Sequence, residues 1–123
     1  MKIATDLEQS RKLAKILTVD SADMYWDYDV QKHECYLMVM DDQFDDTCTR
    51  AWSLAALLDV LPDEITTKDG YEYNLRIVKD DVRYFLFYED SCGEKEDIDT
   101  DYHDDLVDAV YELILKLKDM DLI

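Results

Sequence analysis

The chain has 123 residues, of which 31 are acidic and 13 basic, so its formal net charge at pH 7 is −18. This charge disfavours direct binding to nucleic acid or to any other polyanion. Hydrophobic residues make up 48% of the chain, with 2 Gly and 1 Pro, which excludes a disordered chain and predicts one acidic domain over residues 1–123.

The first half of the chain alternates between helical and extended patterns. Apolar residues at helical spacing from Leu7 to Leu17 predict an amphipathic helix, and period-two alternation from Met24 predicts a strand. The predicted elements are a helix at residues 5–17 capped by Thr5 or Asp6, strands at 24–29 and 34–40 joined by a turn at 30–33, an acidic loop at 41–46, and a buried helix at 49–61 that Thr49 caps and Pro62 ends.

The second half is mostly extended until its last helix. Asp69-Gly70 is the strongest hairpin signal in the sequence. The predicted elements are a short strand at 63–68, a turn at Asp69-Gly70, strands at 71–78 and 82–89 joined by a turn at 79–81, a loop at 90–101, and a helix at 104–120. This order, α-ββ-α-βββ-α, predicts an α+β fold with one antiparallel sheet of about five strands and three helices packed mainly on one face.

The last predicted helix is apolar around more than half of its circumference. Leu106, Val110, Leu113 and Leu117 form its central stripe, and Leu115 widens it on one side. A helix of this kind is either wedged deep in the fold or forms part of a homodimer contact.

Cysteine usage and the lack of long apolar runs bear on location. Cys35, Cys48 and Cys92 are odd in number and include no Cys-x-x-Cys pair, which argues against a disulfide framework and against a zinc site. Residues 1–5 lack the apolar run of a signal peptide, and no segment approaches the roughly 18 apolar residues of a membrane span. We expect a cytoplasmic protein that does not contact a membrane.

Several apolar segments resemble a pattern in known small proteins. These segments are Ala51–Leu58, Leu61–Pro62, Tyr73–Ile77, Val107–Ala109 and Leu113–Leu117. They resemble small uncharacterised acidic α+β proteins that are associated with gut bacteria and with their phages or mobile elements. The resemblance consists mainly of core-forming residues, so it implies a fold and transfers no catalytic residue.

The acidic run before the last helix is the best candidate for a metal site. Asp97, Asp99 and Asp101 stand at alternate positions, from which carboxylates in a loop can converge on a hard cation such as calcium. Tyr102 occupies the place of the turn glycine of a calcium loop, and Asp108 replaces its bidentate glutamate. The alternative is a solvated acidic loop beside a helix N-terminus.

Other catalytic patterns are weak. Cys48 precedes a predicted helix start and Arg50 follows closely, an arrangement that favours thiolate, but catalysis would still need a base and an orienting partner. The alternative for Cys48 is a small residue near a helix cap. The two histidines, His33 and His103, lie far apart in the sequence, and the chain has no glycine-rich phosphate loop. We expect no cofactor and no enzymatic activity.

Tyrosines beside carboxylates form the most suggestive binding pattern. Aromatic rings supply contact area at low entropic cost, and acids select a basic partner. The candidate partner-binding residues are Tyr25, Asp27, Tyr28 and Asp29 on the first hairpin, and Tyr88, Glu89 and Asp90 on the second. The alternative is that one face of each strand is core and the other is merely solvated.

Charge and patterning together favour an interaction protein. The leading hypothesis is a non-enzymatic adaptor or inhibitor that binds a basic protein surface in a phage or mobile-element setting. A narrower form is a DNA mimic that occupies the groove of a nucleic-acid-binding protein. The alternatives are an orphan structural domain or homodimer, and a small metal-binding enzyme that uses the acidic loop at residues 97–108.

Overall fold

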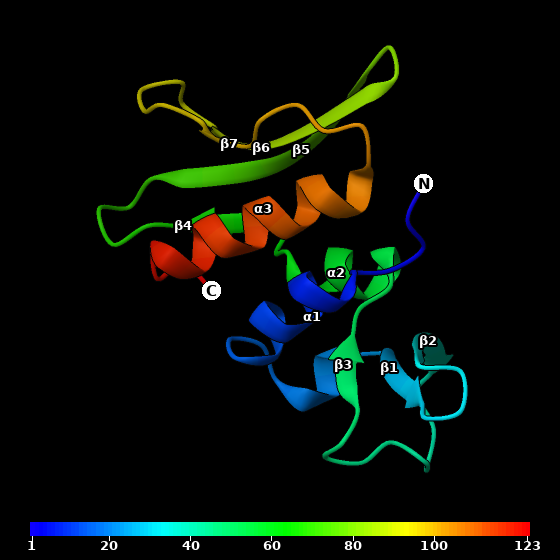
Figure 1. Ribbon diagram of the computed structural model, residues 1–123. Helices are drawn as coiled ribbons and strands as arrows, with labels where there is room; N and C mark the ends of the chain where they lie inside the picture. The colour runs from blue at the N-terminus through cyan, green and yellow to red at the C-terminus, as the bar shows by residue number, and fades with distance from the viewer. The chain divides into compact units, whose positions relative to one another are not determined.

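The computed structural model describes all residues from 1 to 123, and the backbone divides into two compact units, residues 2–59 and residues 60–123 with Met1. Each unit contains one antiparallel sheet (Figure 1), so the predicted α+β class is confirmed. The prediction of one sheet of about five strands is wrong, because the strands form a three-stranded and a four-stranded sheet. Local patterning identifies strands but does not say which distant strands pair.

The first unit carries a three-stranded sheet in the order β2-β1-β3. Helix α1 contacts β3. The elements are α1 (Leu7–Ala14), a short 3₁₀ helix (Val19–Ser21), β1 (Met24–Asp29), β2 (Glu34–Val39), β3 (Thr49–Ala51) and α2 (Leu54–Val60).

Helix α1 begins one residue after Asp6. The Asp6 carboxylate accepts a hydrogen bond from the Gln9 N–H at 2.8 Å, and the Gln9 side chain accepts one from the Asp6 N–H at 3.1 Å, which completes a capping box. Thr5, the other predicted cap, is instead fully buried, and its hydroxyl accepts a hydrogen bond from the Trp52 N–H at 3.1 Å. The sequence therefore predicts where α1 begins, but it does not predict that Thr5 bonds to the Trp52 backbone.

The predicted helix at residues 49–61 is in fact a strand followed by a shorter helix. Thr49 to Ala51 pair with Trp26 to Met24 of β1, because the extended backbone finds its hydrogen-bond partners there. The helix starts after Ser53, whose hydroxyl accepts a hydrogen bond from the Ala56 N–H at 3.2 Å. Ser53, and not Thr49, is thus the residue that caps α2.

The second unit carries a four-stranded antiparallel sheet in the order β4-β5-β6-β7. Its three predicted strands are confirmed, and a short fourth strand, β7, is added from the predicted loop at 90–101. The elements are β4 (Glu64–Thr66), β5 (Glu72–Asp80), β6 (Arg83–Asp90), β7 (Ile98–Asp99) and α3 (Leu106–Asp119).

Helix α3 lies along one face of this sheet and contacts β6 (Figure 1). Its fully buried residues are Val107, Ala109, Val110, Leu113, Ile114 and Leu117, whereas Leu106 and Leu115 of the predicted apolar arc are only partly buried. The homodimer contact through this helix stays a prediction. None of the helices has the length and apolar character needed to cross a membrane.

Candidate functional site

Carboxylates and tyrosines gather on one face of the hairpin formed by β1 and β2. Asp27 stands opposite Tyr36 in the strand register, and Asp29 stands opposite Glu34. Directly paired residues of antiparallel strands share a face, as do residues two apart along a strand. We call these four residues, together with Asp41 of the following loop, the acidic hairpin face.

Two tyrosine hydroxyls fix carboxylates of this face in place. Tyr36 donates a hydrogen bond to Asp27 at 3.1 Å, and Tyr25 donates one to Asp41 at 2.8 Å. The bond to Asp27 raises the pKa of Tyr36, and the bond to Asp41, with burial, raises the pKa of Tyr25 to about 12. Each phenol therefore stays protonated and keeps donating at neutral pH.

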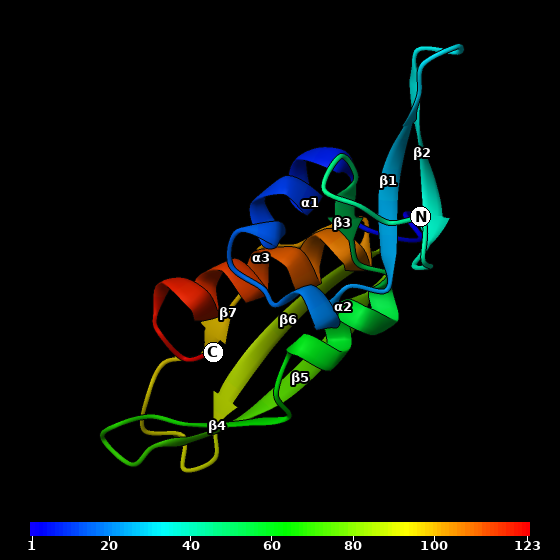
Figure 2. The same cartoon turned by 90° about the horizontal axis from the view of Figure 1, so that it is seen from below.

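The distal half of the hairpin has only two strands. Strand β3 pairs with β1 at Met24 to Trp26 and stops there, whereas the pairing of β1 with β2 continues to Asp29 and Glu34. Figure 2 shows β1 and β2 running on past the end of β3. The acidic hairpin face thus belongs to a two-stranded ribbon in which β1 has no second partner strand beyond Trp26.

The hairpin tip combines an exposed aromatic ring with an ordered turn. Tyr28 points to the face opposite Asp27, is 50% exposed, and its hydroxyl lies 3.2 Å from His33 Nδ1. The Asp29 carboxylate accepts hydrogen bonds from the N–H groups of Gln31 and Lys32 at 3.0 and 3.2 Å. Asp29 therefore shapes the turn as well as adding charge.

Three of the candidate partner-binding residues are buried. Tyr25, Tyr88 and Asp90 are 1%, 0% and 3% exposed, so they offer no contact surface to a partner. Tyr88 lies on the core side of β6 and donates a hydrogen bond to the carbonyl of Pro62 at 2.7 Å. Glu89 is exposed, but it forms an ion pair with Arg76 at 3.4 Å. The second hairpin therefore lacks the predicted arrangement.

Asp90 organises the loop that follows β6. Its carboxylate accepts hydrogen bonds from the N–H groups of Cys92, Glu94 and Lys95 at 3.1, 2.9 and 2.9 Å. Burial alone would raise the pKa of Asp90, but these three donors and the charge of Lys95 outweigh it and lower the pKa. The residue is a structural anchor.

The carboxylates of the acidic run at residues 97–101 are not gathered in one place. No group of three or more His, Cys, Asp or Glu side chains in the chain is placed to hold a metal ion. Asp99 belongs to β7, where it pairs with Phe87, and the N–H of Asp101 points to Glu112 at 3.1 Å. Extended backbone at Asp99 and the tie from Asp101 to α3 keep the three carboxylates from converging.

Glu112 fastens the segment before α3 to the helix. It lies 2.8 Å from His103 Nε2 and 3.3 Å from the Lys116 amine. Burial alone would raise the pKa of Glu112, but the contacts with His103, the Asp101 N–H and Lys116 outweigh it and lower the pKa. His103 and Glu112 are a histidine and a carboxylate in direct contact, as in an acid–base couple. Their contact ties the segment before α3 to the helix.

Cys48 does not stand at a helix start. It precedes β3, and its thiol lies 3.8 Å from the Asp45 carboxylate. The expected help from a helix dipole is missing because α2 begins only at Leu54. The argument for a nucleophilic cysteine therefore loses its main support.

An aromatic cluster on β6 was not predicted from the sequence. Phe85 stacks on Phe87 at 5.7 Å between ring centroids and meets Tyr102 edge-on at 4.8 Å, and Arg83 lies over the Tyr102 ring at 4.7 Å. These β6 residues alternate with the buried Leu86 and Tyr88, so they occupy the other face of the sheet. Period-two alternation along β6 is the sequence signal that separates Phe85 and Phe87 from the buried Leu86 and Tyr88.

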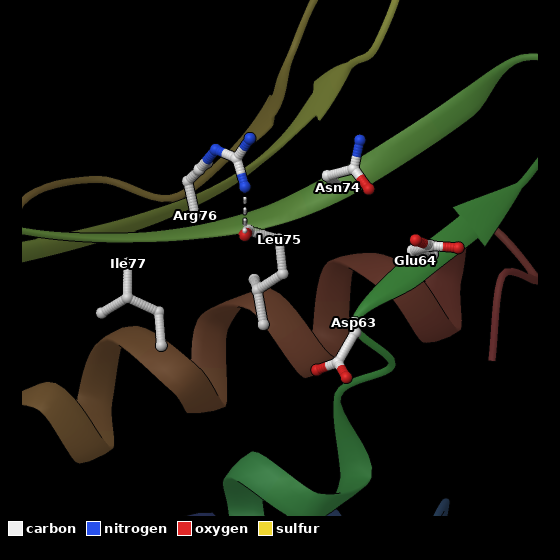
Figure 3. A pocket seen from close by; sticks show the side chains of 6 residues that line it. All are labelled: Asp63, Glu64, Asn74, Leu75, Arg76 and Ile77. Atoms are coloured by element: carbon white, nitrogen blue, oxygen red, sulfur yellow. Dashed lines mark hydrogen bonds between the residues drawn. The ribbon is translucent and has the colours of Figure 1, made fainter.

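A shallow pocket follows the edge of β5 beyond the end of β4 (Figure 3). It has a volume of about 480 Å³ and is lined by Asp63, Glu64, Asn74, Leu75, Arg76 and Ile77. The Arg76 guanidinium turns back along the strand and donates a hydrogen bond to the Leu75 carbonyl at 3.4 Å. A long charged side chain therefore covers part of this open edge.

The surplus of carboxylates exceeds what the chain can neutralise. With 13 basic and 31 acidic residues, one-to-one pairing of every cation would still leave 18 acids unpaired.

Comparisons with protein-family models, with curated proteins and with solved structures gave no match.

Proposed function

We propose that the protein is a non-enzymatic interaction module of the cytoplasm that binds a basic protein surface through its acidic hairpin face. The part of the surface that carries this proposal is the distal hairpin, where Asp27, Asp29 and Glu34 lie on one face beside Tyr36. A phage or mobile-element setting, in which the module acts as an adaptor or inhibitor, is part of the proposal.

The single observation that supports it most is the fixed position of the carboxylates. Asp27 is held by the Tyr36 hydroxyl and Asp41 by the Tyr25 hydroxyl, so both charges are ordered before a partner arrives. Ordered charges lose less conformational entropy on binding than free ones do. The half-exposed Tyr28 at the same tip adds the kind of aromatic contact that often dominates interface energies.

The net charge of −18 supports a basic partner over an acidic one. Long-range attraction speeds encounter with a cationic surface, and the ordered hairpin then supplies local complementarity. In its narrower form the proposal is a DNA mimic, in which the carboxylates occupy the phosphate sites of a nucleic-acid-binding protein.

Titration with an oligo-lysine peptide tests the proposal. Amide NMR shifts of the full chain are followed during the titration, and the largest changes are expected in residues 27–36. The paired change Asp27→Asn and Glu34→Gln should weaken binding about tenfold, because both remove charge and leave the backbone register intact.

The matched control is Glu94→Gln with Glu96→Gln, which removes the same charge from an exposed loop. This control should weaken binding only slightly. Equal weakening by the two pairs, or shift changes spread evenly over the chain, would mean diffuse attraction and no site. The DNA-mimic form is tested separately by displacement of a labelled DNA duplex from a linker histone, and failure to displace it removes that form alone.

A further inference from the structure

We propose that a pocket between α1 and β3 binds a small organic phosphate. These two elements lie side by side (Figures 1 and 2). The pocket between them has a volume of about 480 Å³, within the usual range of small-molecule sites. It shares no residue with the acidic hairpin face, so the inference does not rest on the proposed function.

Three cations line this pocket, in a chain whose acids far outnumber its bases. Arg11 and Lys15 stand four residues apart at the C-terminal end of α1, which makes them neighbours on the helix surface, and Arg50 comes from β3. None of the three forms an ion pair with a carboxylate. Asp46 is the one acid among the lining residues, so the pocket has a formal surplus of two positive charges.

The guanidinium of Arg50 is held in place without being neutralised. Its Nη2 donates a hydrogen bond to the Ala14 carbonyl at 2.8 Å, at the end of α1. Its Nη1 is buried and has no hydrogen-bond partner. Buried donors of this kind are exceptional, because an unpaired N–H costs free energy.

The C-terminal end of α1 offsets only part of the positive charge. The helix macrodipole places about half a negative charge there. Arg11 and Lys15 also repel one another, since like charges four residues apart destabilise a helix. Charges that break such local rules with no compensation in the fold are typical of functional sites.

The charge surplus selects a phosphate monoester over a carboxylate. A phosphate monoester carries a charge of about −1.5 to −2 at pH 7, which matches a surplus of two positive charges, whereas a carboxylate carries only one negative charge. The two arginines, Arg11 and Arg50, can each offer a planar fork of N–H groups that fits a pair of phosphate oxygens.

The apolar part of the pocket selects an organic phosphate over the free ion. Phe44 and Val19 line the pocket together with the cations. Val19 is 58% exposed, and the Phe44 ring meets Tyr25 edge-on at 5.5 Å between centroids. Inorganic phosphate would leave this apolar surface in water, whereas an organic body attached to the phosphate would cover it.

The net charge of −18 selects a small ligand over a polymer. Charges on the surface are screened over about 8 Å at physiological ionic strength, so a small ligand in the pocket interacts mainly with the three cations. A polyanion would extend beyond the pocket and meet the surplus carboxylates.

NMR titration of the full chain with phenyl phosphate tests the inference, at about pH 8, where the phosphate is a dianion, and at about 0.15 M salt. Amide shifts are expected in residues 11–19 and 44–50. Phenyl sulfate has the same ring with one charge fewer, and inorganic phosphate lacks the ring. Each of these two ligands should bind about tenfold more weakly than phenyl phosphate.

Arg11→Gln and Lys15→Gln, both at exposed positions, should each weaken phenyl phosphate binding at least about fivefold. The matched control is Lys12→Gln on the same helix. Lys12 is exposed, lies 3.8 Å from Glu8 and does not line the pocket. Its replacement removes the same charge and should change the affinity less than about twofold. Circular dichroism confirms that the three variants fold.

Three outcomes overturn the proposal. They are no binding at millimolar phenyl phosphate, equal affinity for phenyl sulfate and phenyl phosphate, and a loss of affinity in the control variant as large as in the two pocket variants. Inorganic phosphate that binds as tightly as phenyl phosphate would overturn the assignment of an organic ligand.

Discussion

Carboxylates at individual positions have two distinct roles in this chain. Asp90 and Glu112 accept hydrogen bonds from several donors, and both have a lowered pKa despite burial. Asp27 and Asp41 each accept a hydrogen bond from a tyrosine hydroxyl, and Asp41 is exposed. Some acids of this chain therefore stabilise loops, whereas others contribute mainly to the surface charge. The composition alone does not distinguish the two groups.

Asp90→Asn should destabilise the chain at neutral pH, because an amide cannot accept three N–H bonds with the strength of a carboxylate. Since the pKa of Asp90 is lowered by folding, its contribution is complete above about pH 4 and is lost as the pH falls below that value. Thermal unfolding of both proteins across this range measures it. A melting-temperature gap that persists unchanged at low pH would contradict the assignment.

Asp41→Asn should return the pKa of Tyr25 from about 12 toward the ordinary value of about 10. Because folding raises this pKa, the stability it provides is present below about pH 10 and is lost as the pH rises through about 12. NMR of chains with Cζ-labelled tyrosine follows the titration of Tyr25 directly. Tyr28, whose hydroxyl has no carboxylate partner, serves as the internal control.

At the scale of elements, caps and pairing partners decide where helices and strands begin. The pattern at residues 49–61 predicts a helix throughout, yet residues 49–51 form β3 because they pair with β1, and α2 begins only at Leu54. A tertiary contact thereby overrides the local helical preference of the segment.

The start of α2 yields a test by two hydroxyl deletions. Ser53→Ala should cost about 1 kcal/mol of unfolding free energy, because it removes the cap from the Ala56 N–H. Thr49→Val removes a hydroxyl but keeps the branched shape that suits β3, so its cost should be near zero. Urea denaturation compares them. The reverse order of the two costs would place the helix start at Thr49.

Sequence patterning predicts most elements but fewer of the site residues. β1, β2, β5, β6 and α3 are long enough for their periodicity to be visible, whereas β3 and β7 are too short and depend on distant partners. Alternation along β6 separates Tyr88 from Phe87, but it does not say which of the two faces is covered by α3. For that reason the sequence predicts Tyr88 at the surface and does not reveal the Phe85 cluster.

At the scale of the whole molecule, repulsion among the surplus carboxylates opposes folding. A net charge of −18 on 123 residues raises the free energy of the compact state relative to the expanded one. Few cations lie close enough to acids to compensate, and exposed ion pairs such as Lys12 with Glu8 at 3.8 Å contribute little.

Added sodium chloride should therefore stabilise the fold. Raising it from about 0.02 M to about 0.5 M should increase the melting temperature by several degrees, corresponding to about 1 kcal/mol. Differential scanning calorimetry measures the shift at a protein concentration low enough to keep the chain monomeric. A melting temperature that falls with salt would show that attractive ion pairs outweigh repulsion.

The sheet edges of the chain are unequally protected. β2 has six residues and no Pro, Lys or Arg, whereas β3, β4 and β7 are shorter and the open stretch of β5 carries Arg76 and Lys79. Charged side chains of this kind keep an edge strand from pairing with other chains. Replacing Arg76 and Lys79 by apolar residues would therefore open a second edge and favour aggregation.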